Sequence, residues 1–376
     1  MRNFPVNSLL DHLSRVPLDI PFGPQPDFGP SPGPFIDTGP CNPIYIPPLD
    51  RHFRYSCMNF ARSQASPRKS DCNPRARKEP REQMNMLTAF IDASQVYGST
   101  LKENRRIRLY RHGMLQVTPL DLLPNDKNST CVKDGPGDYC FLAGEMRVNE
   151  HPSLSTLHTI FHRLHNQMAL GLFELNPNWS DEKVSMSHVI TFGHTLIPSK
   201  FTVGREKIRL FRMFNRPRFV LRDDGRSIGK FCSGLMEDHV QRYDRFIVND
   251  LSDLLFQDRD NISMDLASLN IQRARDHGLP GYNEYREVCG MHRIKNFEQF
   301  YREDPERAVI FRRVYDHVDD IDLFPAGVSE RSLPGAVVGS TFACIISQQF
   351  RNLKFGDRYW YENQNRPMAF TPGKGT

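Results

Sequence analysis

The sequence predicts a mainly α-helical protein, and its apolar spacing is the first reason. Between residues 152 and 171, apolar side chains recur three and four positions apart, which is the pattern of one buried helix face. These residues are Leu154, Leu157, Phe161, Leu164 and Met168. Residues 233–256 and 296–318 also have helical patterning, whereas no run of alternating strands occurs. No internal repeat is visible, so the 376 residues are expected to form one domain.

The elements follow one another in a simple order. Residues 17–48 contain eleven prolines, which exclude regular helix and predict an extended strap on the surface. Helical patterning begins near Arg81. Pro152 suits the first turn of the helix over 152–171, so Arg147 and Glu150 are expected in the approach to its N-terminus.

Composition and charge limit the classes of partner. The chain is 39% hydrophobic and 25% charged, and it lacks any run of eighteen apolar residues that could span a bilayer. It is therefore expected to be soluble. The net charge of +5 is too small to indicate a nucleic-acid-binding protein. A basic cluster between Arg68 and Arg81 is interrupted by prolines and is interpreted as a solvated loop.

The eight cysteines show no CxxC pattern of a zinc site, so disulfides are the better interpretation. Cys131 and Cys140 flank a Gly-Pro-Gly turn that would bring their sulfurs together. Three glycosylation sequons, at Asn128, Asn178 and Asn261, favour a secreted, oxidising history together with the cysteines. The first residues, however, lack the apolar core of a signal peptide, so either the start is missing or export fails.

A polar segment at residues 87–99, LTAFIDASQVYGS, places Thr88, Asp92 and Ser94 around the backbone of Phe90. Their oxygens are the hard donors that Ca²⁺ accepts, although on these residues alone a polar turn is the simpler interpretation. The pattern TxFxDxS followed by VYGS resembles the calcium loop of the animal haem peroxidases, the family of myeloperoxidase, peroxidasin and chorion-type peroxidases. The resemblance implies a calcium site at these four residues.

Residues 143–150, AGEMRVNE, resemble the RxxE motif of the same family. The resemblance implies that Arg147 is the distal arginine that polarises the peroxide O–O bond. It implies that Glu150 forms an ester with a haem methyl. A fixed guanidinium stabilises the negative charge that develops on the leaving oxygen. The alternative for this pair is a helix-capping ion pair.

FGHTLI, residues 192–197, and SLNIQRARDHGLPGYN, residues 268–283, also resemble family motifs. They imply that His194 is the proximal ligand of haem iron and that Asn270 accepts its other ring N–H. Arg273 would lie near a haem propionate. Asp276 and His277, which resemble a catalytic dyad, are interpreted as structural.

Three further histidines, His158, His162 and His165, are spaced four and three apart within 152–171 and raise the alternative of a zinc site. HTIFH lacks the glutamate of HExxH, so the segment is interpreted as a packing helix. Residues 327–363 match the late helical region of the family, where Cys344 would pair with Cys289. That closure of a 55-residue loop is worth ~4 kcal/mol in the chain-entropy model. The pairing of Cys41, Cys57, Cys72 and Cys232 stays open.

The resemblance covers nearly the whole chain but departs from the family pattern at several places. SLLDHL, residues 8–13, is the best match for the distal motif and implies that His12 is the acid–base group. Asp11 would be the second ester carboxylate. Leu13 replaces a calcium-binding aspartate, which should weaken Ca²⁺ binding. The segment near 184–193 resembles a fusion of two separated family segments, and the start and the C-terminal end are incomplete relative to the family.

The resemblance implies haem b, attached covalently through Glu150 and Asp11, together with Ca²⁺. It implies an extracellular peroxidase that reduces hydrogen peroxide and oxidises phenolic or halide donors, including tyrosyl groups of matrix proteins. His151 follows Glu150 where a sulfonium link to haem needs methionine, so chloride oxidation is disfavoured. The alternative is a weak or inactive peroxidase-fold protein of the extracellular matrix. A cyclooxygenase-type dioxygenase lacks a candidate tyrosine motif.

Overall fold

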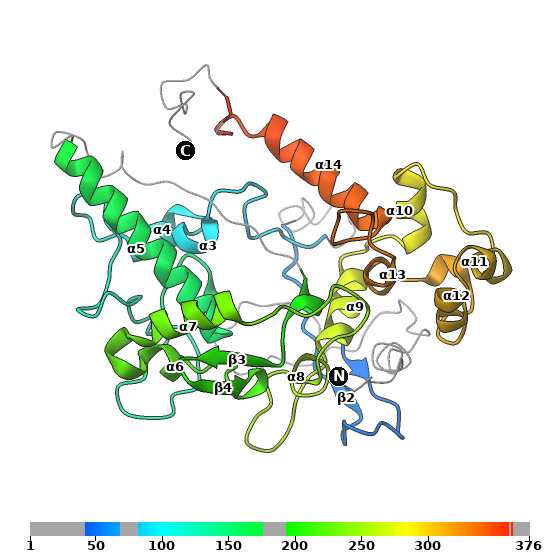
Figure 1. Cartoon of the computed structure of the whole chain (residues 1–376), viewed down its shortest axis with the longest axis horizontal. Helices are drawn as coiled ribbons and strands as arrows, with labels where there is room; N and C mark the ends of the chain where they lie inside the picture. The colour runs from blue at the N-terminus through cyan, green and yellow to red at the C-terminus, as the bar shows by residue number, and fades with distance from the viewer. Residues whose placement is uncertain (1–41, 68–81, 176–192, 361, 364–376) are drawn as a thin grey trace, which may run out of the picture. The chain divides into compact units, whose positions relative to one another are not determined.

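The computed structural model describes residues 42–67, 82–175, 193–360 and 362–363 (Figure 1). Its contacts divide the chain into two compact units, each built from segments that are separated in the sequence. The first unit comprises residues 1–85, 193–197 and 241–349, and the second comprises residues 86–192, 198–240 and 350–376. Helices predominate in the described residues of both units, which confirms the mainly α-helical class.

The first unit is a set of short helices with one small antiparallel sheet. Its described elements are β1 (Ile44–Tyr45), β2 (Cys57–Met58), η3 (His194–Leu196), α8 (Asn249–Ser252), α9 (Leu266–Asp276), α10 (Tyr282–Val288), α11 (Phe297–Glu303), α12 (Pro305–Arg312), η6 (Val318–Asp320) and α13 (Leu323–Ser329). Helix α14 (Ser340–Gly356) begins in this unit and ends in the second.

The proline-rich segment contributes to the core of the first unit, and the prediction of a purely surface strap is wrong in its described part. Ile44 pairs with Met58 across β1 and β2, and both are buried in a cluster with Ile46, Phe53 and Phe60. The prolines exclude helix, but they leave extended backbone free to form a short strand whose alternate side chains turn inward. Residues 17–41 lie outside the described part of the chain.

The second unit is organised around one long helix. Its described elements are α3 (Ser94–Tyr97), α4 (Leu101–Ile107), η1 (Met146–Asn149), α5 (Pro152–Leu175), β3 (Lys200–Val203), β4 (Glu206–Arg209), η4 (Leu210–Arg212), α6 (Arg218–Leu221), η5 (Arg222–Gly225) and α7 (Ser227–Glu237). Helix α5 begins at Pro152, as predicted from the preference of proline for the first turn. The β3–β4 hairpin was not predicted. Gly204, at φ 67°, makes the tight turn that joins its strands.

The buried face of α5 differs from the prediction. Leu157, Leu164 and Met168 are exposed, at 43%, 45% and 53%, so the apolar stripe is not the buried face. Polar residues occupy most of that face instead, and several of them have an internal hydrogen-bond partner that makes burial tolerable. They include Ser155, His158, Thr159, His162 and His165.

Two other predicted helices are shorter than their patterns suggested. In 233–256, α7 ends at Glu237, because the Asp238 carboxylate accepts hydrogen bonds from the backbone N and the hydroxyl of Thr202 and so holds extended backbone. Only the four residues of α8 are helical in the remainder. In 296–318, Pro305 disfavours helical backbone at Asp304 and separates α11 from α12. Asp304 then caps α12 through the backbone N of Arg307.

Both predicted disulfides are confirmed. Cys131 bonds to Cys140 within the second unit, and Cys289 bonds to Cys344 within the first. Cys57 and Cys232 are free thiols, and Cys41 and Cys72 lie outside the described residues. Within the described residues, no helix combines the length and the apolar character that crossing a membrane requires.

Candidate functional site

The residues predicted to lie on the distal side of the haem, Arg147 and Glu150, come just before the N-terminus of α5. Arg147 is in η1, and Glu150 is the residue that ends this short helix. Glu145 holds the guanidinium of Arg147, with 2.6 Å between Oε1 and Nε, and this hydrogen bond raises the pKa of Arg147. Burial raises the pKa of Glu150, while the nearby charge of Arg147 opposes that shift. This role of Glu145 was not predicted, although the residue stands two positions before Arg147 in the motif.

The predicted proximal group joins two distant parts of the sequence within the first unit. His194 is the first residue of η3, and its ring is exposed. Its Nδ1 lies 3.1 Å from Nδ2 of Asn270 on α9, a residue 76 positions away. With the amide of Asn270 turned so that its oxygen faces the ring, Nδ1–H donates and the opposite nitrogen, Nε2, keeps its lone pair for a metal.

Further along α9, Arg273 and Asp276 belong to a charged network in the first unit. The carboxylate of Asp276 is fully buried and accepts hydrogen bonds from Nε of Arg62 at 2.6 Å and from the backbone N of Ser63 at 2.9 Å. Burial raises the pKa of Asp276, but these donors and the charge of Arg273 outweigh it, and the pKa lies below its ordinary value. His277 contacts the hydroxyl of Ser63, so the geometry supports the structural interpretation of this pair.

One side of the Arg273 guanidinium contacts other protein groups. Its guanidinium stacks 4.1 Å from the ring centre of Phe60 and donates to the carbonyl of Ala61. Its side chain remains 43% exposed, which leaves part of the group accessible to an anion such as a carboxylate.

The predicted calcium loop brings its oxygens together in the second unit. The hydroxyl of Thr88 lies 3.4 Å from both the carbonyl oxygen of Phe90 and the hydroxyl of Ser94. Neighbouring ligands at right angles around Ca²⁺ are about 3.3–3.7 Å apart, given bonds of about 2.3–2.6 Å. Asp92 lies in the same turn and accepts a hydrogen bond from the backbone N of Ser94 at 3.0 Å. The Thr88 oxygen therefore lies at a distance within this range from the oxygens of Phe90 and Ser94.

This loop contacts the approach to α5 through a close backbone approach. The N–H of Gly144 donates to the carbonyl of Val96 at 3.0 Å. A Cβ atom on Gly144 would lie 2.1 Å from the nitrogen of Gly98 and 2.4 Å from the carbonyl oxygen of Ser94. Only glycine therefore allows this contact between the loop and the segment that carries Arg147.

The three histidines of α5 hydrogen-bond to protein groups. His158 Nδ1 lies 2.7 Å from the carbonyl of Leu154, and His162 Nε2 lies 2.8 Å from that of Gln116. His165 contacts the Tyr97 hydroxyl and the Gly113 carbonyl. Burial lowers the pKa of His162 to about 4, so it is neutral at physiological pH. These contacts support a packing role, whereas His12 and Asp11 lie outside the described residues.

Comparison with known families decides among the interpretations. A family model described as animal haem peroxidase matches residues 31–187 and 184–375. The chain belongs to the animal haem peroxidase family. The two matched stretches meet at residues 184–187, where the sequence had indicated a fusion of separated family segments.

Relatives and a solved structure agree with this membership. The chain is 31% identical to the human peroxidasin homolog over 413 aligned positions, covering 90% of this chain and 28% of the relative. It is 32% identical to the chorion peroxidase of Drosophila melanogaster, covering 88% of this chain and 49% of the relative. The structure of peroxidase A from Dictyostelium discoideum superposes with a TM-score of 0.71 at 25% identity, covering 86% of this chain and 75% of that one. The chain thus spans half or less of the length of these two curated relatives.

A haem group fits residues of this animal haem peroxidase chain on two observations. In the first unit, His194 presents an exposed imidazole that Asn270 orients. In the second unit, the start of α5 buries polar atoms that have no hydrogen-bond partner among the described residues: Nε2 of His151 and the hydroxyls of Ser153 and Thr156. Buried polar atoms of this kind are completed by an ordered water, an ion or a bound group, and haem is one such group.

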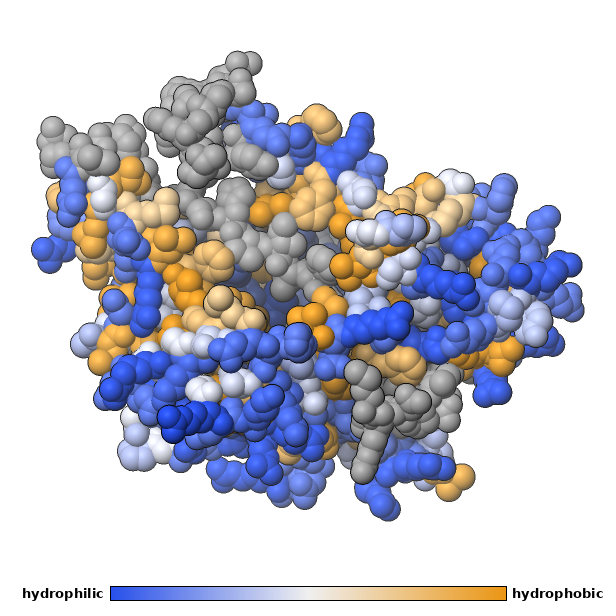
Figure 2. All heavy atoms as spheres, in the orientation of Figure 1, coloured by the Kyte–Doolittle hydropathy of each residue, from blue (hydrophilic) through white to orange (hydrophobic). Residues whose placement is uncertain are grey.

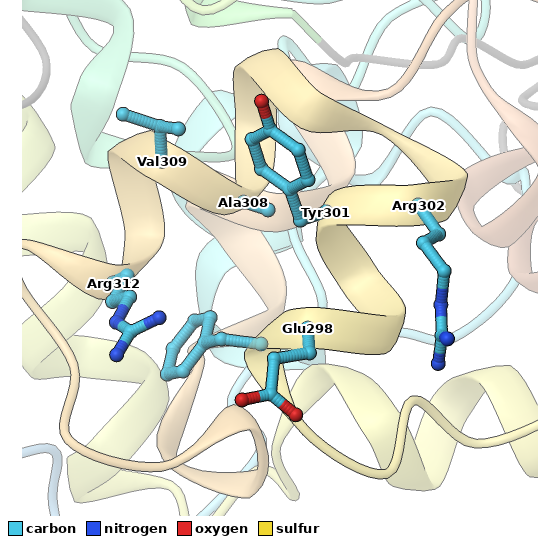
Figure 3. Close-up of a pocket in the computed structure, with 7 residues that line it drawn as sticks. Glu298, Tyr301, Arg302, Ala308, Val309 and Arg312 are labelled. Carbon is cyan, nitrogen blue, oxygen red and sulfur yellow. The ribbon is translucent and has the colours of Figure 1, made fainter.

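A cavity of about 450 Å³ lies elsewhere in the first unit, between α11 and α12 (Figure 3). Phe297, Tyr301, Ala308 and Val309 give it an apolar lining, and charged side chains stand at its sides. None of the predicted site residues that the structure describes lines it.

Proposed function

We propose that this chain is a haem-dependent peroxidase that reduces hydrogen peroxide and oxidises phenolic, tyrosyl or halide donors. Family membership supports the reaction class, and the contact between His194 and Asn270 is the observation that carries the proposal. Haem b supplies the redox centre when bound. His194 would hold its iron, and Asn270 would keep the imidazole oriented and basic.

The remaining residues would stabilise charge, transfer protons and hold the haem. Arg147, held by Glu145, would stabilise negative charge on the departing peroxide oxygen. His12 would take a proton from hydrogen peroxide and return it to that oxygen. Glu150 and Asp11 would attach haem by ester bonds. Arg273 would pair with a haem propionate.

Calcium and secretion complete the proposal. Thr88, Phe90, Asp92 and Ser94 would bind Ca²⁺ weakly, because Leu13 offers no side-chain oxygen. The two disulfides support an extracellular location, and the sequon residues Asn128 and Asn261 are exposed. We further propose that residues 1–376 form one family domain shortened near 184–193. In support, 413 aligned positions cover only 90% of this 376-residue chain, so the relative has positions that the chain lacks.

Replacing His194 with alanine tests the proposal. Purified wild-type protein reconstituted with haem should show a Soret band of a histidine-ligated iron, and His194→Ala should lose that ligation. The matched control is His292→Ala, an exposed histidine of the same unit. Identical haem spectra for wild type and His194→Ala would refute the assignment. Arg147→Ala should keep haem and slow peroxide cleavage.

A second candidate function is a weak or inactive peroxidase-fold protein of the extracellular matrix. The shortened segment and the exposed apolar stripe on α5 favour it. A guaiacol assay with peroxide separates the two candidates, because haem-loaded protein without turnover would support the matrix protein.

A further inference from the structure

The second unit contains a strongly basic segment with no part in the proposed peroxidase chemistry. Residues 200–230 contain ten lysine and arginine residues against three carboxylates, an excess of +7. The whole chain carries only +5, so the rest of the sequence is slightly acidic. Charge is therefore concentrated in one short stretch, which begins with the β3–β4 hairpin. Hydrophilic side chains cover this region of the surface in Figure 2.

The acidic groups of this segment are already engaged by other cations. Glu206 pairs with Arg222 at 3.3 Å, and Asp224 pairs with Arg226 at 3.9 Å. Asp223 pairs with Lys230. Outside the segment, Asp134 holds Arg216 and Arg218. These pairs neutralise the C-terminal half of the segment and leave its N-terminal half unbalanced.

The unbalanced cations are Lys200, Arg205, Lys207 and Arg212. Each is exposed, and none has a carboxylate within ion-pair distance among the described residues. Asp238 also reaches this hairpin, but its two carboxylate oxygens accept hydrogen bonds from Thr202.

The register of the hairpin aligns several of these charges. Lys200 faces Arg209, and Lys207 faces Thr202, so Lys200, Lys207 and Arg209 project from one face. On the opposite face Phe201 and Val203 are buried. Like charges directly opposite each other, as in the pair Lys200 and Arg209, destabilise a strand pair, and an anion bound at this face would lessen that repulsion. We call Lys200, Arg205, Lys207, Arg209 and Arg212 the basic hairpin face.

Phe211 fixes two of the guanidinium groups. Arg209 lies 4.7 Å and Arg212 lies 5.6 Å from its ring centre, so stacking on the ring restricts both side chains. A planar guanidinium held in this way presents paired N–H donors to a tetrahedral oxyanion.

We propose that the basic hairpin face binds a sulfated polysaccharide. Two features favour this polyanion over a membrane or a nucleic acid. Within residues 200–230 no large apolar side chain is exposed that could enter a bilayer. The aromatic ring at the face, Phe211, is half-buried and flanked by arginines, which leaves no open ring on which bases could stack.

The test uses the full chain and immobilised heparin as the probe. The face variant is Lys200→Gln/Arg205→Gln/Lys207→Gln. The control is Lys102→Gln/Arg105→Gln/Lys127→Gln, which removes the same charge from exposed positions of the same unit. We expect Kd to rise at least about tenfold in the face variant, and the salt dependence to fall by roughly 0.7–0.9 per cation removed. The control should bind like wild type.

Several results would overturn the proposal. If heparin binding weakened equally in both variants, only the net charge of the protein would matter. If the wild-type protein did not bind heparin at physiological ionic strength, the proposal would be wrong. Chemically desulfated heparin that still binds would exclude sulfate recognition. Tighter binding to single-stranded RNA or to anionic phosphatidylserine vesicles at equal salt would assign the face to that polyanion instead. Unchanged melting curves for both variants establish that each is folded.

Discussion

Two buried polar groups, one in each unit of the molecule, tolerate burial in opposite ways. In the first unit, the carboxylate of Asp276 is buried as an ion, and Arg62 and Arg273 approach from positions far apart in the sequence or one helical turn away. In the second unit, the buried His162 of α5 donates to a backbone carbonyl and stays neutral. Pairing keeps a charge inside the first unit, whereas loss of charge makes burial tolerable in the second.

The two units also differ in the length of chain that their disulfides close. Cys289–Cys344 closes a separation of 55 residues in the first unit, and Cys131–Cys140 closes only 9 in the second. The units should respond differently to reduction and to acid.

Disulfide removal should give the largest effect. In the chain-entropy model, Cys289→Ser/Cys344→Ser costs about 4 kcal/mol of unfolding free energy, and Cys131→Ser/Cys140→Ser about 2.6 kcal/mol. Denaturant unfolding of both double variants measures the difference. Equal losses would show that loop length does not set the contrast between the units.

Removing the buried carboxylate should come next. Asp276→Ala leaves Arg62 and Arg273 without their shared partner and should cost about 2–3 kcal/mol, below the full cost of breaking a buried pair because both arginines are partly exposed. Asp260→Asn, at an exposed position of the same unit, is the control and should change stability by less than about 0.5 kcal/mol. A similar small change in both variants would contradict an ionic network in the first unit.

The buried groups of the two units should lose their contributions to stability in different pH ranges. The folded pKa of His162 is about 4 against 6.5 for an ordinary histidine, so the unfolded chain binds more protons between these values. Stability should therefore fall as pH drops from about 6.5 to about 4, by on the order of 2 kcal/mol. The folded pKa of Asp276 lies below 3.8, so its contribution is lost only at lower pH.

Unfolding free energies measured from pH 7 to pH 4 check this order. His162→Gln should reduce the dependence, with His151, whose pKa burial lowers to about 3, accounting for part of the remainder, while His239→Gln, at an exposed position, should leave it unchanged. If both variants follow the wild-type curve, His162 is not the group that titrates.

Calcium should have the smallest effect on stability. A weak site at ten times its Kd adds about 1.4 kcal/mol, and chelation should remove that amount. Melting curves with and without chelator, repeated with Asp92→Ala, provide the measurement. A calcium-dependent shift that survives in Asp92→Ala would place the ion elsewhere.

Local features of this protein could be predicted from the sequence itself. Long-range features could be predicted only through the resemblance to family motifs. Pro152 marked the start of α5, and the turn between Cys131 and Cys140 marked a disulfide, because each depends on a few adjacent residues. The pairing of His194 with Asn270 crosses 76 positions, and nothing in either short segment alone specifies it.

The errors have a common physical cause, which is that hydrogen-bond partners are invisible in a periodicity pattern. Apolar spacing assigned Leu157 and Leu164 to the core of α5, but His162 and His165 found carbonyl partners on neighbouring loops and were buried instead. Likewise, Asp238 ends α7 because Thr202, on a hairpin distant in the sequence, binds its carboxylate.

The glycine contact between the calcium loop and the approach to α5 has a thermodynamic consequence. Backbone meets backbone at Gly144 and Gly98, so neither segment can shift without moving the other. We expect the binding of Ca²⁺ to the loop and the conformation of Arg147 to be energetically coupled. Such coupling is reciprocal: an anion bound at Arg147 must change the affinity for Ca²⁺ by the same factor by which Ca²⁺ changes affinity for the anion. Replacing Gly144 with alanine should therefore disturb both the loop and the segment that carries Arg147, because the added methyl group would lie 2.1 Å from the nitrogen of Gly98.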